Sequence, residues 1–326
     1  MADVINIAGV SYCGQQANEV LIKPTFLTGQ MEAYFDVMLS IKSRKQLALD
    51  DNLEDIIQVS SGCGRDVTGE VITLTEKFID VCDAKINLDQ CVKGLRDSFM
   101  EEWARSGNAE FDITGTRIAD YILEKVQAGM RTDLWRLVWF GNTALTGDQV
   151  LKICDGFWTR LIADAQTYTI ANKYNIPTSL TTDSALDALK SLHDNASSLL
   201  DNVPNSDKYF AVTRTIWDNY LATNEDACCG DRGIILTNEG TRTLFFRGIE
   251  VRKESEWDRA ISAKNLSNPN RILYTTKTNL VVGTDAMADT NALEILYNPY
   301  DKTNQVDAEF KIGTQYKYAE LVGIGY

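Results

Sequence analysis

The sequence contains a single histidine, His193, among 326 residues. A Ser-His-Asp triad would therefore have to use His193, and no local signature of such a site surrounds it. His193 stands between Leu192 and Asp194 in a predicted helix, where a solvated side chain is the more common outcome. The patterns G-x-x-x-x-G-K-[ST], G-x-S-x-G and H-E-x-x-H are also missing. The sequence thus provides no motif for catalysis, for a cofactor or for a metal ion.

Long hydrophobic runs are absent as well, and none approaches the length that spans a bilayer. The N-terminus lacks the basic segment and apolar run that are typical of a secretory signal. The seven cysteines are scattered, without the C-x-x-C spacing of zinc ribbons. We therefore expect a soluble chain with free thiols that is made in the cytoplasm and has no membrane partner.

Basic residues are outnumbered, with 32 Lys and Arg against 46 Asp and Glu, which gives a net charge of −14. An acidic surface repels phosphate backbones, so general nucleic-acid binding is disfavoured. The densest acidic cluster, residues 50–55, lacks the ligand spacing of an EF-hand and is interpreted as a solvated turn. A carboxylate-dependent hydrolase stays open as an alternative, provided that two acidic side chains converge in a cleft.

Residues 114–141 predict the longest helix. Apolar side chains recur there at every fourth position: Ile118, Ile122, Val126, Met130, Leu134 and Val138. Thr114 or Thr116 could cap its start, and Gly141 could close its end in a left-handed conformation. The helix would be roughly 40 Å long. A strict spacing of four winds around the axis, so we expect a spine whose two ends contact different partners. An ordinary long core helix is the alternative.

The first part of the chain predicts an arm followed by a hairpin. Residues up to 27 are weakly patterned, whereas residues 32–49 alternate in polarity like a strand. A glycine-rich stretch at 60–70 separates them from further strands at 71–74 and 78–81. We expect a long β-hairpin with Lys42, Arg44 and Lys45 at its tip. Such a hairpin is marginal by itself in water, so a partner subunit is expected to support it.

The rest of the sequence predicts both helices and strands. Helices are predicted at 88–105, 149–163 with a break near Gly156, 184–200 after Asp183, 214–222 and 255–263. Strands are predicted at 209–212 and at 243–251, with a bulge at Gly248. Beyond Pro269, strands at 272–274, 279–283, 293–297, 306–312 and 316–322 predict one small β-layer packed against the spine helix. The fold class is α+β.

The tail of the chain carries a family resemblance. Residues 271–285, RILYTTKTNLVVGTD, residues 291–326 and the middle segment 203–222, VPNSDKYFAVTRTIWDNYLA, resemble tailed-bacteriophage major capsid proteins of the Hong Kong 97-type capsid fold. The resemblance implies an N-terminal arm at 1–28 and an extended β-hairpin loop at 29–78. It further implies a peripheral domain, with the spine helix, at 79–142 and 269–326, and an axial domain at 143–268.

The resemblance also implies a function. Copies of the chain would assemble as hexamers and pentamers into an icosahedral head that encloses double-stranded DNA without reading its sequence. Scaffolding, portal and head-decoration proteins are the implied partners, and the implied location is the virion, assembled in the host cytoplasm. A tail or connector protein that forms rings or tubes is the alternative. The candidate subunit-contact residues are Phe26, Arg44, Lys45, Trp257 and Tyr300, although each could be an ordinary buried aromatic or solvated base.

Overall fold

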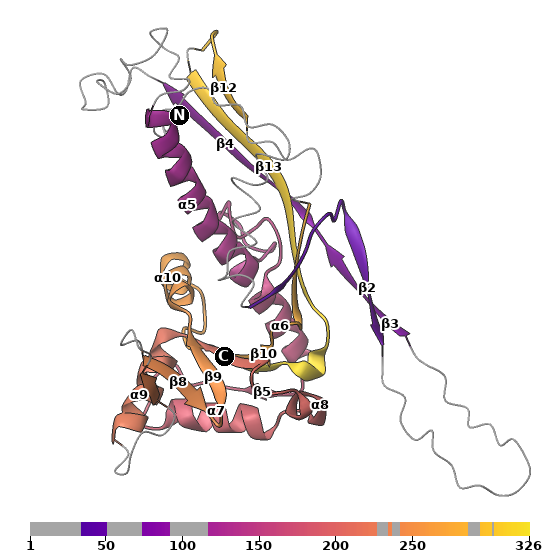
Figure 1. The fold of residues 1–326 in the computed structure, drawn as a ribbon, viewed down its shortest axis with the longest axis vertical. Helices are drawn as coiled ribbons and strands as arrows, with labels where there is room; N and C mark the ends of the chain where they lie inside the picture. The colour runs from indigo at the N-terminus through magenta and orange to yellow at the C-terminus, as the bar shows by residue number, and fades with distance from the viewer. Residues whose placement is uncertain are drawn as a thin grey trace, which may run out of the picture.

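The computed structural model describes residues 34–50, 74–91, 117–226, 234–236, 242–285, 294–301 and 303–326. The predicted arm at 1–28, with Phe26, lies outside these residues. The described chain is α+β, as predicted, and elongated (Figure 1). Its longest helix and two longest strands run side by side along the molecule. A second sheet with its helices lies at one end, and a two-stranded ladder points away from the body.

The predicted spine helix is confirmed as α5, Arg117–Phe140. Its described buried side chains lie in the second half of the helix: Met130, Leu134, Leu137, Val138, Trp139 and Phe140. The caps Thr114 and Thr116 and the side chains of 117–124 lie outside the described set, so the idea of two different partners stays a prediction.

Gly141 ends helix α5 for a different reason from the one predicted. Its φ lies outside the left-handed region. A Cβ at Gly141 would stand 2.1 Å from the carbonyl oxygen of Cys154, and Gly156 donates a backbone hydrogen bond to Gly141 at 2.8 Å. The glycine is therefore required by the close approach of the following loop, and the predicted left-handed cap is wrong.

The five-stranded sheet lies against α5. Its strands are β1 (Asp36–Met38), β4 (Cys82–Cys91), β11 (Leu280–Thr284), β12 (Glu294–Asn298) and β13 (Thr303–Tyr316). Strands β4 and β13 pair in antiparallel register over ten positions, from Cys82 opposite Ile312 to Cys91 opposite Thr303. The helix predicted at 88–105 is therefore wrong over 88–91, where the chain is still strand, and the rest of that range is not described.

The seven-stranded sheet lies at the opposite end from β12 (Figure 1). Its strands, in spatial order, are β5 (Lys173–Tyr174), β14 (Gly323–Gly325), β10 (Ile272–Thr276), β6 (Lys208–Val212), β9 (Ile249–Lys253), β8 (Arg242–Phe246) and β7 (Ile234–Leu236). The strand predicted at 209–212 is confirmed. The strand predicted at 243–251 is instead a hairpin, because Arg247 and Gly248 both adopt positive φ, 50° and 83°, and form a two-residue turn.

The remaining helices match their predictions with small changes. They are α6 (Phe157–Gln166), α7 (Ser184–Asp194), α8 (Ser198–Asn202), α9 (Arg214–Asp226) and α10 (Ser255–Lys264). Gly156 is the N-cap residue of α6, so residues 149–155 are not part of that helix. The helix predicted at 184–200 divides into α7 and α8, since Ser197 accepts a hydrogen bond from the amide of Leu200 and starts a new helix.

The tail does not form one layer. Strands β10 and β14 belong to the seven-stranded sheet, whereas β11, β12 and β13 belong to the other sheet. The strand predicted at 316–322 is also wrong, because β13 ends at Tyr316 and a 3-10 turn, η3 (Ala319–Leu321), follows. Asn279 lies where the chain passes between the sheets, and its side-chain amide makes two hydrogen bonds to the backbone of Tyr318, at 2.8 and 3.0 Å.

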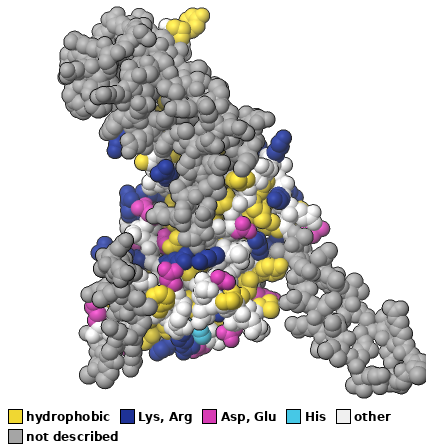
Figure 2. Space-filling model, in the orientation of Figure 1, with side chains coloured by type: hydrophobic (Ala, Val, Ile, Leu, Met, Phe, Trp, Pro, Cys, Tyr) yellow, Lys and Arg dark blue, Asp and Glu magenta, His cyan; other side chains and the backbone are white. Residues whose placement is uncertain are grey.

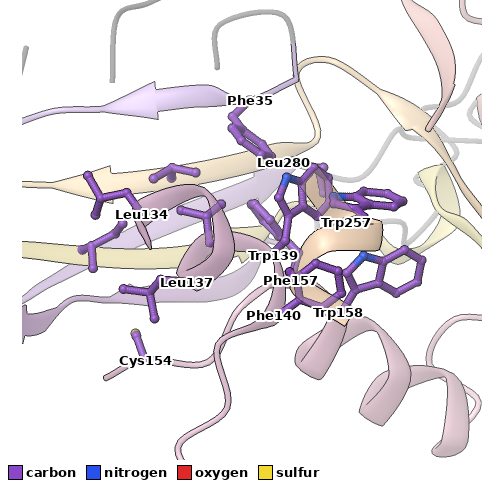
Figure 3. Packing of buried hydrophobic residues seen from close by; sticks show 14 of the residues in the cluster. Phe35, Leu134, Leu137, Trp139, Phe140, Cys154, Phe157, Trp158, Trp257 and Leu280 are labelled. Atoms are coloured by element: carbon purple, nitrogen blue, oxygen red, sulfur yellow. The ribbon is translucent and has the colours of Figure 1, made fainter. Parts of the chain in front are cut away.

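The main core lies between α5, α6, α10 and the five-stranded sheet, and it is rich in aromatic rings (Figure 3). The rings of Trp139 and Trp158 lie 4.7 and 5.2 Å from that of Trp257, in edge-to-face geometry. Such pairs stabilise a core beyond the area they bury, by about 0.5–1.5 kcal/mol each. A second cluster, built around Phe210 and Tyr274, fills the space between the seven-stranded sheet and helices α7 and α9.

Candidate subunit-contact surface

The two-stranded ladder consists of β2 (Arg44–Asp50) and β3 (Leu74–Asp80), and it confirms the predicted antiparallel pairing. Its register places Arg44 opposite Asp80 and Asp50 opposite Leu74. The linking residues 51–73 are not described. Arg44 and Lys45 therefore lie at the root of the hairpin, next to the body (Figure 1), and their predicted place at its tip is wrong.

The predicted strand at 32–49 is interrupted before the hairpin starts. Residues Asp36–Met38 form β1, which pairs in parallel with β11 of the five-stranded sheet. The chain then turns at Ser40, whose φ is 64°, and the amide of Ile41 donates to the carbonyl of Thr284 at 3.0 Å. This turn separates β1, which is paired within the body, from β2, which forms the hairpin.

Apolar packing fixes the root of the hairpin on the body. Ile41, Ile79 and Val281 form a small core of their own, with exposures of 2%, 0% and 0%. A Cβ at Gly283 would come within 2.8 Å of the terminal methyl groups of both isoleucines. A Cβ at Gly313 would lie 2.2 Å from the backbone oxygen of Asp80. The hairpin thus leaves the body in a direction set by two glycines of β11 and β13.

Polar contacts reinforce the same root. The side-chain amide of Gln315 donates to the carbonyl of Phe78 at 2.9 Å. Lys77 donates to the carbonyl of Tyr316 at 3.4 Å, and its ammonium group stands 3.7 Å from the centre of that ring. Burial lowers the pKa of Lys77, and the nearby Asp164 acts in the opposite direction. No sequence motif marks Gln315 or Lys77 as a residue that holds the hairpin.

The predicted contact residues fall into three groups. Arg44 is ion-paired with Asp80 at 3.0 Å, although its side chain stays 57% exposed, and Lys45 beside it is exposed. Tyr300 is 94% exposed in the turn between β12 and β13, away from the hairpin root. Trp257 is completely buried in the main core, so its prediction as a contact residue is wrong.

The face of the β4–β13 ladder that points away from α5 is polar. Asp83 and Lys311 are paired across it at 3.2 Å, and Lys85 stands directly opposite Glu309. Figure 2 shows basic and acidic side chains interspersed over the described part of the visible surface. Asp83 and Lys311, and likewise Lys85 and Glu309, therefore place opposite charges facing each other within the chain.

A buried polar cluster that sequence reasoning missed joins the first described residue to the rest. The Tyr34 hydroxyl donates to the carboxylate of Glu254, and the Tyr209 hydroxyl donates to the carbonyl of Tyr34 at 3.2 Å. The guanidinium group of Arg252 stands 5.1 and 4.9 Å from the two tyrosine rings. Burial raises the pKa of Glu254 to about 7. The cluster fixes Tyr34 on the body of the molecule.

No three His, Cys, Asp or Glu side chains in the described ranges are grouped so that they could hold a metal ion. Among the described helices, none is both long and apolar enough to cross a membrane.

Comparison with known proteins identifies the fold. No family model and no curated protein sequence matches the chain. Solved structures do match. A chain of a satellite phage P4 procapsid structure, which includes the size determination protein, aligns at TM-score 0.58 and 12% identity, covering 94% of this chain and 98% of the other.

Two further solved structures agree with that match. A chain from Mycobacterium phage Ogopogo aligns at TM-score 0.54 and 12% identity over 100% and 96% of the two chains. A chain of the capsid structure of cyanophage P-SCSP1u aligns at TM-score 0.50 and 13% identity over 100% and 91%. The chain therefore has the fold of phage capsid chains, and the fold that its tail residues suggested is confirmed at this level.

Proposed function

We propose that the chain is the major capsid protein of a tailed phage, with a structural and not a catalytic role. Copies assemble as hexamers and pentamers into an icosahedral head that encloses double-stranded DNA. The observation that carries the proposal is the likeness in fold to a procapsid chain over nearly the full length of both chains. Such a likeness leaves little of either chain for an added catalytic or binding domain.

The hairpin supports self-assembly on physical grounds. Among the described strands, β2 and β3 pair only with each other, and an isolated two-stranded ladder is marginally stable in water. Its root is nevertheless held firmly by Ile41, Ile79 and the two glycines. A rigid root directs the rest of the hairpin towards a neighbouring copy, which supplies the missing support. Arg44 and Lys45 stay proposed as contact residues on this basis, and Tyr300 stays proposed because its ring is exposed.

The domain layout of the Hong Kong 97-type fold is part of the proposal. The arm is 1–28, and the extended loop is 29–78, with its ladder reaching Asp80. The peripheral domain, 79–142 and 269–326, contains α5 and most of the five-stranded sheet. The axial domain, 143–268, contains most of the seven-stranded sheet. Strands β10 and β14 follow residue 268 in sequence but pair within the seven-stranded sheet.

The charge of the chain fits a container for DNA. A net charge of −14 disfavours tight adhesion to the enclosed phosphate backbone. Scaffolding, portal and head-decoration proteins would complete a particle that assembles in the host cytoplasm. Glu254 does not support a hydrolase: it is 7% exposed and accepts a hydrogen bond from Tyr34, so it is not open to a substrate.

Electron microscopy of the purified full chain, with sedimentation velocity on the same sample, tests the proposal. We expect closed shells, or rings of six and five copies that convert to shells as the concentration rises. Tubes or a ring of one fixed size would show a tail or connector protein instead. A chain that stays monomeric or dimeric at every concentration, alone and in crowding agents, would contradict both assemblies.

A further inference from the structure

One edge of the five-stranded sheet has no partner strand within the described ranges. Strand β4 pairs with β13 over ten positions, and no other described strand pairs with it. No backbone hydrogen bond leads from β4 to another described segment. In an antiparallel pair, every second residue directs its N–H and C=O groups away from the partner strand. The outer edge of β4 therefore presents backbone donors and acceptors along roughly 30 Å of strand.

The side chains of β4 divide between two faces. The polar side chains are exposed on the face that points away from α5: Asp83, Lys85, Asn87 and Asp89. On the other face, Ile86 and Leu88 are half-buried and packed against the main core. A further strand at this edge would cover more of both apolar side chains and would extend the polar row.

The charges of β4 select one register for pairing with a second copy of the same strand. Charged side chains on an edge strand normally prevent pairing. With Asn87 opposite itself in an antiparallel pair, however, Lys85 of each copy stands opposite Asp89 of the other. With Lys85 or Asp89 at the centre, like charges face each other. With position 86 at the centre, Asp83 faces Asp89, and with position 88 at the centre no two charges meet.

We propose that two copies of the chain pair through β4, in antiparallel register centred on Asn87, across a twofold axis perpendicular to the sheet. The same surface is then used by both copies, as in isologous interfaces. On the apolar face, Ile86 of each copy stands opposite Leu88 of the other. Neither Lys85 nor Asp89 is in an ion pair within the described ranges, so both charges are available to a partner.

The pairing joins two five-stranded sheets into one continuous sheet. Main-chain hydrogen bonds supply affinity in such strand addition, and the facing side chains supply specificity. An icosahedral shell contains twofold axes, so the contact has a natural place in the proposed function. Only that place rests on the proposed function, because the pairing itself requires no more than two copies of the chain.

Reversal of single charges tests the register. Lys85→Glu places two carboxylates face to face on both sides of the axis, and Asp89→Lys places two ammonium groups there. Each variant alone should raise the concentration at which the chain associates roughly tenfold. An equal mixture of the two variants restores opposite charges in every mixed pair and should return this concentration close to that of the natural chain. Light scattering over a concentration series measures it. A mixture that associates no better than either variant would overturn the register.

A cysteine crosslink reports the same register in whatever assembly forms. The full chain with Asn87→Cys and Cys91→Ser is oxidised with a copper–phenanthroline catalyst, alkylated and digested with trypsin. Both positions lie in the tryptic peptide 86–93, which is INLDQCVK in the natural chain. Opposite Cα atoms in an antiparallel pair are about 4.5–5.5 Å apart, within the range of a disulfide. We expect this peptide linked to a second copy of itself.

Asp89→Cys in the same Cys91→Ser background is the matched control, because its thiol lies in the same peptide and on the same face. In the proposed register the two thiols are about 14 Å apart along the strands, so the self-linked peptide should be roughly tenfold less abundant. Equal yields from the two variants, or no self-linked peptide from Asn87→Cys, would contradict the pairing. Shells that form without this link would leave the proposed function standing and remove only the β4 contact.

Discussion

At the scale of single residues, Glu254 is the carboxyl group whose environment changes most clearly on folding. It is 7% exposed, accepts a hydrogen bond from Tyr34 and lies close to Arg252. Burial outweighs both favourable contacts, because the pKa rises from 4.5 to about 7. Below pH 4.5 the group is protonated in both the folded and the unfolded chain. Between these two pKa values the folded chain holds a proton that the unfolded chain has lost.

The free energy of unfolding should therefore fall as the pH rises through this window. A shift of this size corresponds to about 3 kcal/mol of stability that is present at pH 4.5 and lost above pH 7. Glu254→Gln removes the titrating carboxyl group, so the free energy of unfolding of this variant should depend less on pH between pH 4.5 and 7. Urea unfolding of the unassembled chain, measured at several pH values, checks this prediction.

Glu309→Gln provides a matched control for that measurement. Glu309 is exposed on β13, and its replacement should leave the pH profile unchanged. If the natural chain and Glu254→Gln show parallel profiles, the carboxyl group of Glu254 is not protonated near neutral pH in the folded chain, and the prediction fails.

At the residue scale, the sequence contains a usable signal only where a spacing is informative. Trp257, Ala260 and Ile261 are all buried and follow the i, i+3, i+4 spacing of one helical face. That spacing could have identified Trp257 as a core residue, and the prediction of a subunit contact overlooked it. Tyr34 and Glu254 have no such pattern, since their contact joins residues 220 positions apart.

At the scale of elements, the sequence predicted α5 and the β2–β3 pairing because both depend on local periodicity. It failed at 88–91, where Leu88 fits a helical stripe with later residues and also a strand with Ile86. Pairing with β13 decides the outcome, and no local pattern reports that partner. Gly248 was recognised as a special position, but the two-residue turn was missed because the positive φ of Arg247 has no sequence signal.

Gly313 provides a test of how the hairpin is fixed to the body. A Cβ at this position would lie 2.2 Å from the backbone oxygen of Asp80, which cannot move without shifting β3. Gly313→Ala should lower the free energy of unfolding by about 1–3 kcal/mol. It should also increase hydrogen exchange in residues 44–50 and 74–80, because the root of the hairpin loosens. Thermal unfolding and hydrogen–deuterium exchange measure the two effects.

Gly129→Ala is the control for that substitution. Gly129 lies inside α5, and no atom is within 4 Å of a Cβ built there. Replacing a helical glycine by alanine should stabilise the chain by roughly 0.5–1 kcal/mol. If both variants change stability in the same direction, the close approach at Gly313 does not hold the hairpin root.

At the scale of the whole molecule, the main surprise is the division of the tail between two sheets. Residues 272–276 and 280–284 are consecutive buried strands with similar composition, so the sequence predicted one layer. Their partners differ: β10 pairs with β6 and β14, and β11 pairs with β1 and β13. Only these long-range pairings place the two strands in different sheets. The family resemblance did not separate them either, because it implied that all of 269–326 belongs to one domain.

Tyr300 offers a test of the whole assembly. It is 94% exposed, yet its turn is held in place, because its amide donates to the side chain of Asn298 at 3.0 Å and Asn298 donates to Asp301 at 2.9 Å. Tyrosine on an ordered turn contributes to an interface at a low entropy cost. Tyr300→Ala should leave the free energy of unfolding within about 0.5 kcal/mol of the natural chain.

Assembly should respond differently from stability to that substitution. Loss of a contact worth about 1.4 kcal/mol weakens each interface roughly tenfold, so the concentration at which shells form should rise at least severalfold. Light scattering across a concentration series measures this threshold. Tyr168→Ala is the matched control, since Tyr168 is also largely exposed, at 77%. One face of its ring already contacts Lys173 of the same chain, whose ammonium group stands 3.9 Å from the ring centre. An unchanged threshold for Tyr300→Ala, or an equal rise for both variants, would remove Tyr300 from the subunit contacts and leave Arg44 and Lys45 at the hairpin root.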